Sequence, residues 1–254
     1  MTLTQAPPAA RYALSLGDDC LVLAQRLSEW SSCAPELEED VALTNIALDL
    51  LGQARSLLTH AGELEGAGRD EDDLAFLRDE RDFLNAQLVE LPNGDFAHTM
   101  VRQLLFSTYQ HALYARLQRS TDALLAGVAE KGVKEVAYHL DHAARWTVRL
   151  GDGTEESHDR MQAALDAVWP FAAELFEPGA ASAELVGRGI AVDPSTLREG
   201  WEESVTDVLT KATLAVPQAT WQPTGGRSGL HTEGFGLLLA TMQHVHRAHP
   251  GARW

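Results

Sequence analysis

Helical periodicity runs through almost the whole sequence, and the alternation of apolar and polar residues that marks β-strands is hard to find. The chain has 254 residues, 45% of them hydrophobic, so it is long enough to bury a large core. We therefore predict an all-α fold in a single domain over residues 1–254. Its core should be a four-helix bundle over about 12–176, followed by additional C-terminal helices over about 178–254.

Four long helices are expected, approximately over residues 12–30, 35–66, 96–118 and 122–150. Pro35 suits the first position of the second helix, Gly66 suits its end, and Asp95 can cap the third helix. The second helix contains the run VALTNIALDLLGQARSLLTHAGELEG, which is apolar on most faces. A helix of this kind is expected to lie deep inside a bundle.

Shorter segments connect and extend these helices. A charged helical connection is expected over residues 69–91, ended by the turn sequence PNGD. A fifth helix should begin after Thr154 and kink at Pro170, because proline cannot continue a helical hydrogen-bond ladder. A further helix is expected near residues 194–212, and a last one ends near residue 248.

Charge and cysteine usage exclude several classes of protein. The chain carries 37 acidic and 20 basic residues, a formal charge of −17 that repels nucleic acid and anionic lipid alike. Cys20 and Cys33 have no C-x-x-C spacing, and the N-terminus lacks the basic start and apolar run of a signal peptide. No apolar run is long enough to span a bilayer. We therefore expect a soluble protein of the cytoplasm that binds neither nucleic acid nor membranes.

A helical bundle of this size raises the question of a metal site. Ferritin-like bundles hold two metal ions with inward-facing carboxylates and with a Glu-x-x-His pair on each of two helices. Two acid-x-x-His matches occur here, Asp95 to His98 and Glu155 to His158, and both fall in the first turn of an expected helix. Metal ligands belong in mid-helix, so we interpret both acids as helix caps or as partners of the helix dipole.

The mid-helix positions lack the required donors. The second helix offers Leu50 and Gln53 where a Glu-x-x-His pair belongs, and a leucine cannot bind a metal. In the stretch KEVAYHLDH, Val136 stands three residues before His139 in place of a glutamate. Glu135 and His139 do face one another, but one such pair supplies too few ligands for a dinuclear site.

Other candidate chemistries are weaker still. We interpret Glu135, Tyr138 and His139 as a buried polar group. The sequence has no G-x-S-x-G, no P-loop and no G-x-G-x-x-G after a strand. No ligand role is required of the three histidines near the C-terminus, His244, His246 and His249. From the residues alone, the chain is an all-α bundle with a degenerate metal site.

Several longer blocks, spread in order over nearly the whole chain, carry a resemblance to a known family. They are LGDDCLVLAQRLSEW, APELEEDVALTNIALDLLGQAR, DEDDLAFLRDERDFLN, VELPNGDFAHT, KEVAYHL, RLGDGTEES and GGRSGLHTEGFG. In these blocks the chain resembles the C-subunit family of bacterial phenylacetyl-CoA epoxidases. The extent of the match makes it more specific than any single short motif.

The resemblance implies a fold, an activity and partners. The fold would be ferritin-like, and the activity that of a multicomponent monooxygenase that epoxidises the aromatic ring of phenylacetyl-CoA. A catalytic A subunit would carry the di-iron centre, and an NADPH-dependent reductase would supply electrons. This chain would be the non-catalytic structural subunit, with no metal or cofactor of its own, in a side-by-side complex with the catalytic subunit.

The resemblance also implies roles for individual residues. Residues at the places of the catalytic subunit's metal ligands would be Cys20, Leu50, Gln53, Ser107, Val136 and His139. Only His139 is a good ligand among them. Contact with the acyl-CoA substrate is implied at Asp82, Phe83, Leu84 and Asn85, and more weakly at Ala183, Glu184 and Leu185, where this chain departs from the family pattern.

One alternative from a different class stays open. It is a self-sufficient di-metal ferritin-like oxidase, whose ligands would have to be drawn from Asp18, Asp19, Asp49, Glu135 and His139.

For the favoured structural subunit, we expect the second and third long helices to make the contact with the catalytic subunit. Exposed apolar surface on them would then favour homo-oligomers when the chain is alone.

Overall fold

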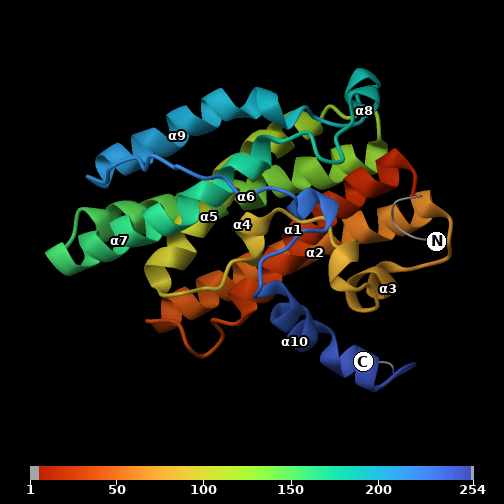
Figure 1. Cartoon of the computed structure of the whole chain (residues 1–254), viewed down its shortest axis with the longest axis horizontal. Helices are drawn as coiled ribbons and strands as arrows, with labels where there is room; N and C mark the ends of the chain where they lie inside the picture. The colour runs from red at the N-terminus through yellow and green to blue at the C-terminus, as the bar shows by residue number, and fades with distance from the viewer. Residues whose placement is uncertain (1–5, 253–254) are drawn as a thin grey trace. The chain divides into compact units, whose positions relative to one another are not determined.

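The computed structural model describes residues 6–252, and none of these residues lies in a β-strand. The all-α fold predicted from the sequence, with four long helices and further C-terminal helices, is confirmed (Figure 1). The chain forms two compact units, one made of Met1–Pro92 with Gly225–Trp254 and the other of Asn93–Thr224. None of the helices in the described part is long and apolar enough to cross a membrane.

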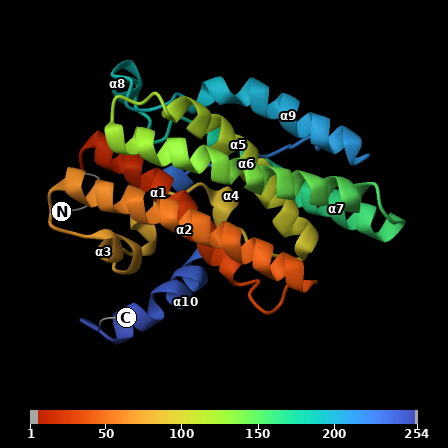
Figure 2. The ribbon, with the colours of Figure 1, turned by 180° about the vertical axis from the view of Figure 1, so that it is seen from behind.

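The first unit is built on two long helices, α1 (Pro8–Ser28) and α2 (Leu37–Glu65). They pack side by side along their length (Figures 1 and 2). Helix α2 begins after Glu36 rather than at Pro35, so Pro35 lies before the helix instead of at its first position. It ends at Gly66 as expected, where the left-handed φ of 67° is one that glycine adopts without strain.

The charged connection after α2 is broken into short pieces, whereas one helical segment was expected. These pieces are α3 (Glu71–Phe76), the 3₁₀ turn η2 (Glu80–Asp82) and α4 (Gln87–Glu90). The unit is completed by the 3₁₀ turn η5 (Gly226–Ser228) and helix α10 (Phe235–Ala248), which packs against α3 and η2. Residues far apart in sequence therefore meet around the connection.

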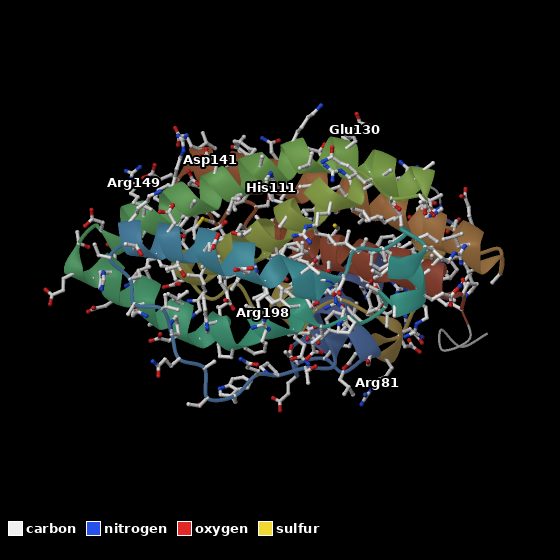
Figure 3. All side chains as sticks on the ribbon, turned by 90° about the horizontal axis from the view of Figure 1, so that it is seen from above. Arg81, His111, Glu130, Asp141, Arg149 and Arg198 are labelled. Carbon is white, nitrogen blue, oxygen red and sulfur yellow. The ribbon has the colours of Figure 1, made fainter. Side chains whose placement is uncertain are left out.

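The second unit is built on α5 (Phe96–Leu117) and α6 (Ala123–Gly151), which pack against each other. The cap expected at Asp95 is confirmed, because its side chain accepts the His98 amide at the start of α5. Asp122 caps α6 in the same way, by accepting the amides of Leu124 and Leu125. Helix α6 is amphipathic. Figure 3 shows Glu130, Asp141 and Arg149 on its outer side, while Val136 and His139 are buried.

Shorter helices cover α5 and α6. Helix α7 (Glu155–Val168) and helix α9 (Arg198–Lys211) each contact both α5 and α6. In the sequence, α7 and α9 are separated by η3 (Trp169–Phe176), α8 (Ala183–Gly187) and η4 (Pro194–Leu197). Thr154 caps α7 as predicted. Helix α7 ends at Val168 and 3₁₀ geometry follows from Trp169, so the helix stops just before Pro170 instead of continuing through it with the expected kink.

Candidate functional site

A buried ion pair joins α1 to the broken connection. Asp18 and Arg78 have side chains 0% and 1% exposed, and the guanidinium of Arg78 makes a two-pronged contact with the Asp18 carboxylate. Asp18 Oδ2 also accepts the backbone N–H of Leu84 at 2.9 Å. The planar guanidinium lies 4.0 Å from the ring centre of Phe83. Charges this deep persist only where they are paired and hydrogen-bonded.

A second buried pair lies beside the first. Asp19 Oδ2 is 2.7 Å from Arg227 Nη2, and Asp19 Oδ1 accepts the backbone N–H of Ala86 at 2.8 Å. Burial raises the pKa of Asp19, although the positive charge and hydrogen bond of Arg227 act in the opposite direction. Arg227 also donates to the carbonyl oxygens of Ser15 and Leu84, each at 3.2 Å. One arginine thus ties three segments of the unit together.

A third pair, Glu90 with His231, completes the arrangement, and both side chains are fully buried. Glu90 Oε2 lies 2.7 Å from His231 Nδ1 and 2.8 Å from Asn85 Nδ2, and Oε1 accepts the Thr232 amide at 2.6 Å. His231 Nε2 faces the Phe83 carbonyl oxygen at 3.1 Å. A carbonyl oxygen can only accept, so Nε2 carries a proton, and a second proton must lie between Nδ1 and Glu90.

The three pairs bond to four backbone groups within residues 83–86, namely the Phe83 carbonyl oxygen, both backbone groups of Leu84 and the Ala86 amide. We call Asp18, Asp19, Arg78, Glu90, Arg227 and His231 the buried ionic cluster. Gly229 allows the close approach of its loop, because a Cβ there would lie 2.3 Å from the Arg81 carbonyl oxygen and its φ is +77°. The cluster joins four blocks that were separate in the sequence, LGDDCLVLAQRLSEW, DEDDLAFLRDERDFLN, VELPNGDFAHT and GGRSGLHTEGFG. Each charge of the cluster is paired, and the bonds hold the broken connection and the loop of residues 227–232 against α1.

Sequence reasoning did not predict the buried ionic cluster as such. Asp18 and Asp19 were noted only as possible metal ligands of an oxidase. A signal was present, since two adjacent aspartates inside the apolar run LGDDCLVLA must be buried and therefore need cationic partners. Both carboxylates are bonded to arginines, which leaves them poorly suited to binding metal ions.

The expected metal-ligand positions lie on the long helices, and all six are buried. On α1 and α2, Cys20 Sγ is 3.7 Å from Gln53 Oε1, and Leu50 is fully buried. The remaining three, Ser107, Val136 and His139, are buried on α5 and α6. Among residues 6–252, no three His, Cys, Asp or Glu side chains are grouped so that they could hold a metal ion. A thiol, an amide and a leucine do not fit a di-iron centre, which needs carboxylates and histidines.

The positions implied for substrate contact differ in exposure. Phe83, Leu84 and Asn85 are buried in the first unit, and Asp82 is partly exposed. In the second unit, Leu185 of α8 is buried, and its two neighbours, Ala183 and Glu184, are exposed. Contact of either set with the acyl-CoA stays a prediction.

Comparison with known proteins identifies the family of this chain. A family model described as phenylacetic acid catabolic protein matches residues 1–254. The chain belongs to this family. It is 52% identical over 243 residues to the C subunit of the 1,2-phenylacetyl-CoA epoxidase of Escherichia coli (strain K12). That alignment covers 96% of this chain and 98% of the relative, so the resemblance stated from the sequence blocks is confirmed.

The two acid-x-x-His matches serve local structure, as the sequence analysis predicted. Asp95 Oδ1 accepts the backbone N–H of His98 at 3.1 Å and lies 2.7 Å from the His98 ring nitrogen Nδ1. His158 Nδ1 lies 2.7 Å from the carbonyl oxygen of Gly151. Burial would raise the pKa of Asp95, but the hydrogen bonds and charge of His98 together with Arg160 hold it below its usual value.

The polar group expected on α6 is only partly buried. His139 is 1% exposed, whereas Tyr138 is 51% exposed, so the prediction that Tyr138 is buried is wrong. Glu135 lies 3.2 Å from Lys131, one turn earlier on the same helix. The helical period explains the difference, because position 138 lies on the polar side of α6 beside Lys134 and Asp141.

Replacing Asp95 with alanine should lower the free energy of unfolding by about 1 kcal/mol at neutral pH, because α5 loses its cap. Asp95→Asn keeps the capping oxygen and should cost less. The folded-state pKa of Asp95 is depressed, so its charge stabilises the fold above the unfolded pKa near 3.8. Urea unfolding at several pH values should show the wild-type advantage over Asp95→Asn shrinking as pH falls through this region. A pH-independent difference would contradict the assignment.

Proposed function

We propose that this chain is the non-catalytic structural subunit of a phenylacetyl-CoA epoxidase, supporting a di-iron catalytic A subunit in aerobic phenylacetate catabolism. The observation that carries the proposal is the donor set on α1 and α2, where Cys20 contacts Gln53 and Leu50 fills a ligand position. Family membership and 52% identity to the C subunit of an epoxidase support it. The metal chemistry then belongs to the partner.

The remaining components follow from the same proposal. The partner would hold the di-iron centre, and an NADPH-dependent reductase would supply electrons to it. This chain would act in the cytoplasm without nucleic acid or membrane, consistent with its charge of −17. Its contribution would be mechanical, because a packed neighbour that stiffens the ligand-bearing helices holds the ligands within the narrow tolerance that catalysis needs.

Phenylacetyl-CoA would be bound by the complex, with this chain contributing a limited contact. In the segment of residues 82–85, the buried ionic cluster already engages the Leu84 amide and the carbonyl oxygens of Phe83 and Leu84. The Asp82 side chain is the accessible polar group of the segment. We propose that it accepts a hydrogen bond from an amide N–H of the acyl-CoA. Ala183 and Glu184 of α8 form the second, weaker candidate contact.

Metal content and activity test the proposal together. Three expression experiments are compared: this chain alone, this chain together with the di-iron catalytic subunit, and the catalytic subunit alone. Co-expression should yield a stable complex with about two iron ions per catalytic subunit and epoxidation of phenylacetyl-CoA. Omitting this chain should abolish epoxidation. If the isolated chain carries about two iron or manganese ions and consumes oxygen, the self-sufficient di-metal oxidase is correct instead.

A further inference from the structure

The outer face of α2 carries a residue pattern typical of helix–helix packing, and the side chains of this pattern are exposed. Positions 37, 41, 44, 48, 51 and 55 follow alternating steps of four and three residues, and all six side chains are exposed. Four of them are large and apolar, and their exposed fractions are 76% for Leu37, 54% for Val41, 58% for Leu48 and 47% for Leu51. This is the a/d spacing with which one helix packs against another. We call positions 37–55 of this pattern the α2 seam.

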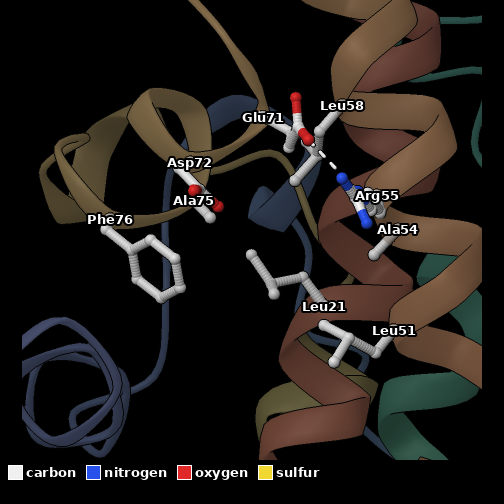
Figure 4. Close-up of a pocket in the computed structure, with 9 residues that line it drawn as sticks. All are labelled: Leu21, Leu51, Ala54, Arg55, Leu58, Glu71, Asp72, Ala75 and Phe76. Carbon is white, nitrogen blue, oxygen red and sulfur yellow. Dashed lines mark hydrogen bonds and ion pairs between the residues drawn. The ribbon is translucent and has the colours of Figure 1, made fainter. Parts of the chain in front are cut away.

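The seam leads into a pocket. Its cavity volume is about 360 Å³, at the small end for binding pockets, which suits one or two bulky side chains. Figure 4 shows apolar side chains from three elements around the opening, including Leu21 of α1, Leu51 of α2 and Phe76 of α3. Arg55 lies at the rim, where its Nε is 3.1 Å from Glu71. Leu51 belongs to both the seam and the pocket, so the two form one continuous surface.

Charge specifies what fits this surface. Acidic residues stand at both ends of the seam, in the first turn of α2 and in the first turn of α3. Glu71 neutralises Arg55, and Asp72 is exposed with no ion-pair partner among residues 6–252. A second copy of this chain would bring a further charge of −17 to the contact. The surface therefore favours a helix with an apolar stripe flanked by lysine or arginine.

We propose that the α2 seam docks one positively charged helix of the catalytic subunit, with one bulky apolar side chain of that helix inserted in the pocket. The inference rests on the proposed function and locates its interface. It also narrows the earlier expectation that the second and third long helices share the contact. Among the described residues, α5 has no large apolar side chain in the exposed class, whereas α2 has four.

Binding measurements on surface variants test the proposal. Leu51→Asp places a charge at the junction of seam and pocket and should weaken binding to the purified catalytic subunit by about a hundredfold or more. Leu51→Met should change it less than about threefold. The control is Leu237→Asp, because Leu237 is 75% exposed on α10 and lies outside the seam. It should leave affinity unchanged, and thermal unfolding should show that all variants are folded.

A second pair of variants tests the charge. Asp72→Asn should weaken binding severalfold and reduce its dependence on salt, because an attraction across the interface is lost. Glu63→Gln makes the same change in charge on an exposed part of α2 outside the seam and should have little effect on either quantity. Equal salt dependence in the wild type and Asp72→Asn would overturn the assignment of a positively charged partner helix.

The outcomes separate the docking inference from the proposed function. If the wild-type chain does not bind the catalytic subunit, both fail. If it binds and Leu51→Asp binds equally well, the seam is not the interface and only the docking inference fails. If Leu51→Asp instead dissolves a homo-oligomer of the isolated chain without affecting the catalytic subunit, the seam is the contact of a second copy.

Discussion

Replacing Arg78 with methionine should lower the free energy of unfolding by about 3–5 kcal/mol, because Asp18 would be left as a buried carboxylate without its cation. The neighbouring side chains cannot compensate, since Asp18 is 0% exposed and only the Leu84 amide at 2.9 Å would remain to it. Arg78 additionally donates to the Asp82 carbonyl oxygen at 2.9 Å. Urea unfolding at neutral pH measures the loss.

The matched control is Arg145→Met on α6. Arg145 also pairs with an aspartate, at 2.9 Å from Asp141, but its side chain is 79% exposed. An exposed pair one helical turn apart contributes a few tenths of a kcal/mol, so this variant should unfold almost like the wild type. Similar losses in Arg78→Met and Arg145→Met would show that the buried ionic cluster does not hold the first unit together.

The long helices were predictable because their information is local. Asp95, Asp122 and Thr154 cap helices by bonding to amides two or three residues ahead, and Gly66 ends α2 through its own backbone conformation. Such features are visible in any short window of sequence. The acid-x-x-His matches at helix starts could be set aside for the same reason.

The broken connection was not predictable in this way. The Leu84 and Ala86 amides bond to Asp18 and Asp19, more than 60 positions earlier, and Arg227 donates to the Leu84 carbonyl oxygen from 143 positions later. These long-range bonds replace the helical ladder that local propensity favours. The local helical pattern of residues 69–91 therefore predicted one helical segment, whereas the structure has three short pieces.

Helix α2 shows a different limit. Its apolar residues correctly predict a buried side, since Leu43, Ile46 and Leu50 are fully buried. Composition alone also predicted that the whole helix lies deep in a bundle, but the α2 seam is exposed in this chain. A sequence does not distinguish apolar residues that pack within the chain from those that pack against a partner. The α2 seam became recognisable only once the side facing α1 was known.

The polar network around Glu90 should be equally costly to break. Glu90→Ala should lower the free energy of unfolding by about 3 kcal/mol or more, because His231, Asn85 and the Thr232 amide all lose their acceptor inside the first unit. The exposed acid Glu156, which pairs with Arg160 on α7, provides the control, and Glu156→Ala should cost less than about 0.5 kcal/mol.

Glu90→Gln should cost clearly less than Glu90→Ala. The introduced amide oxygen can still accept the Thr232 N–H, and its NH₂ group can donate to His231 Nδ1 while Nε2 continues to donate to the Phe83 carbonyl oxygen. Asn85 can adapt, because its Oδ1 is buried without a hydrogen-bond partner and could accept the second amide proton after a flip. Hydrogen exchange at the Thr232 amide should then quicken strongly in Glu90→Ala and little in Glu90→Gln, with the Ala86 amide, held by Asp19, as the internal reference. Equal exchange and equal stability in the two variants would mean that the side-chain volume at position 90, rather than its hydrogen bonds, positions the loop that carries Arg227 and His231.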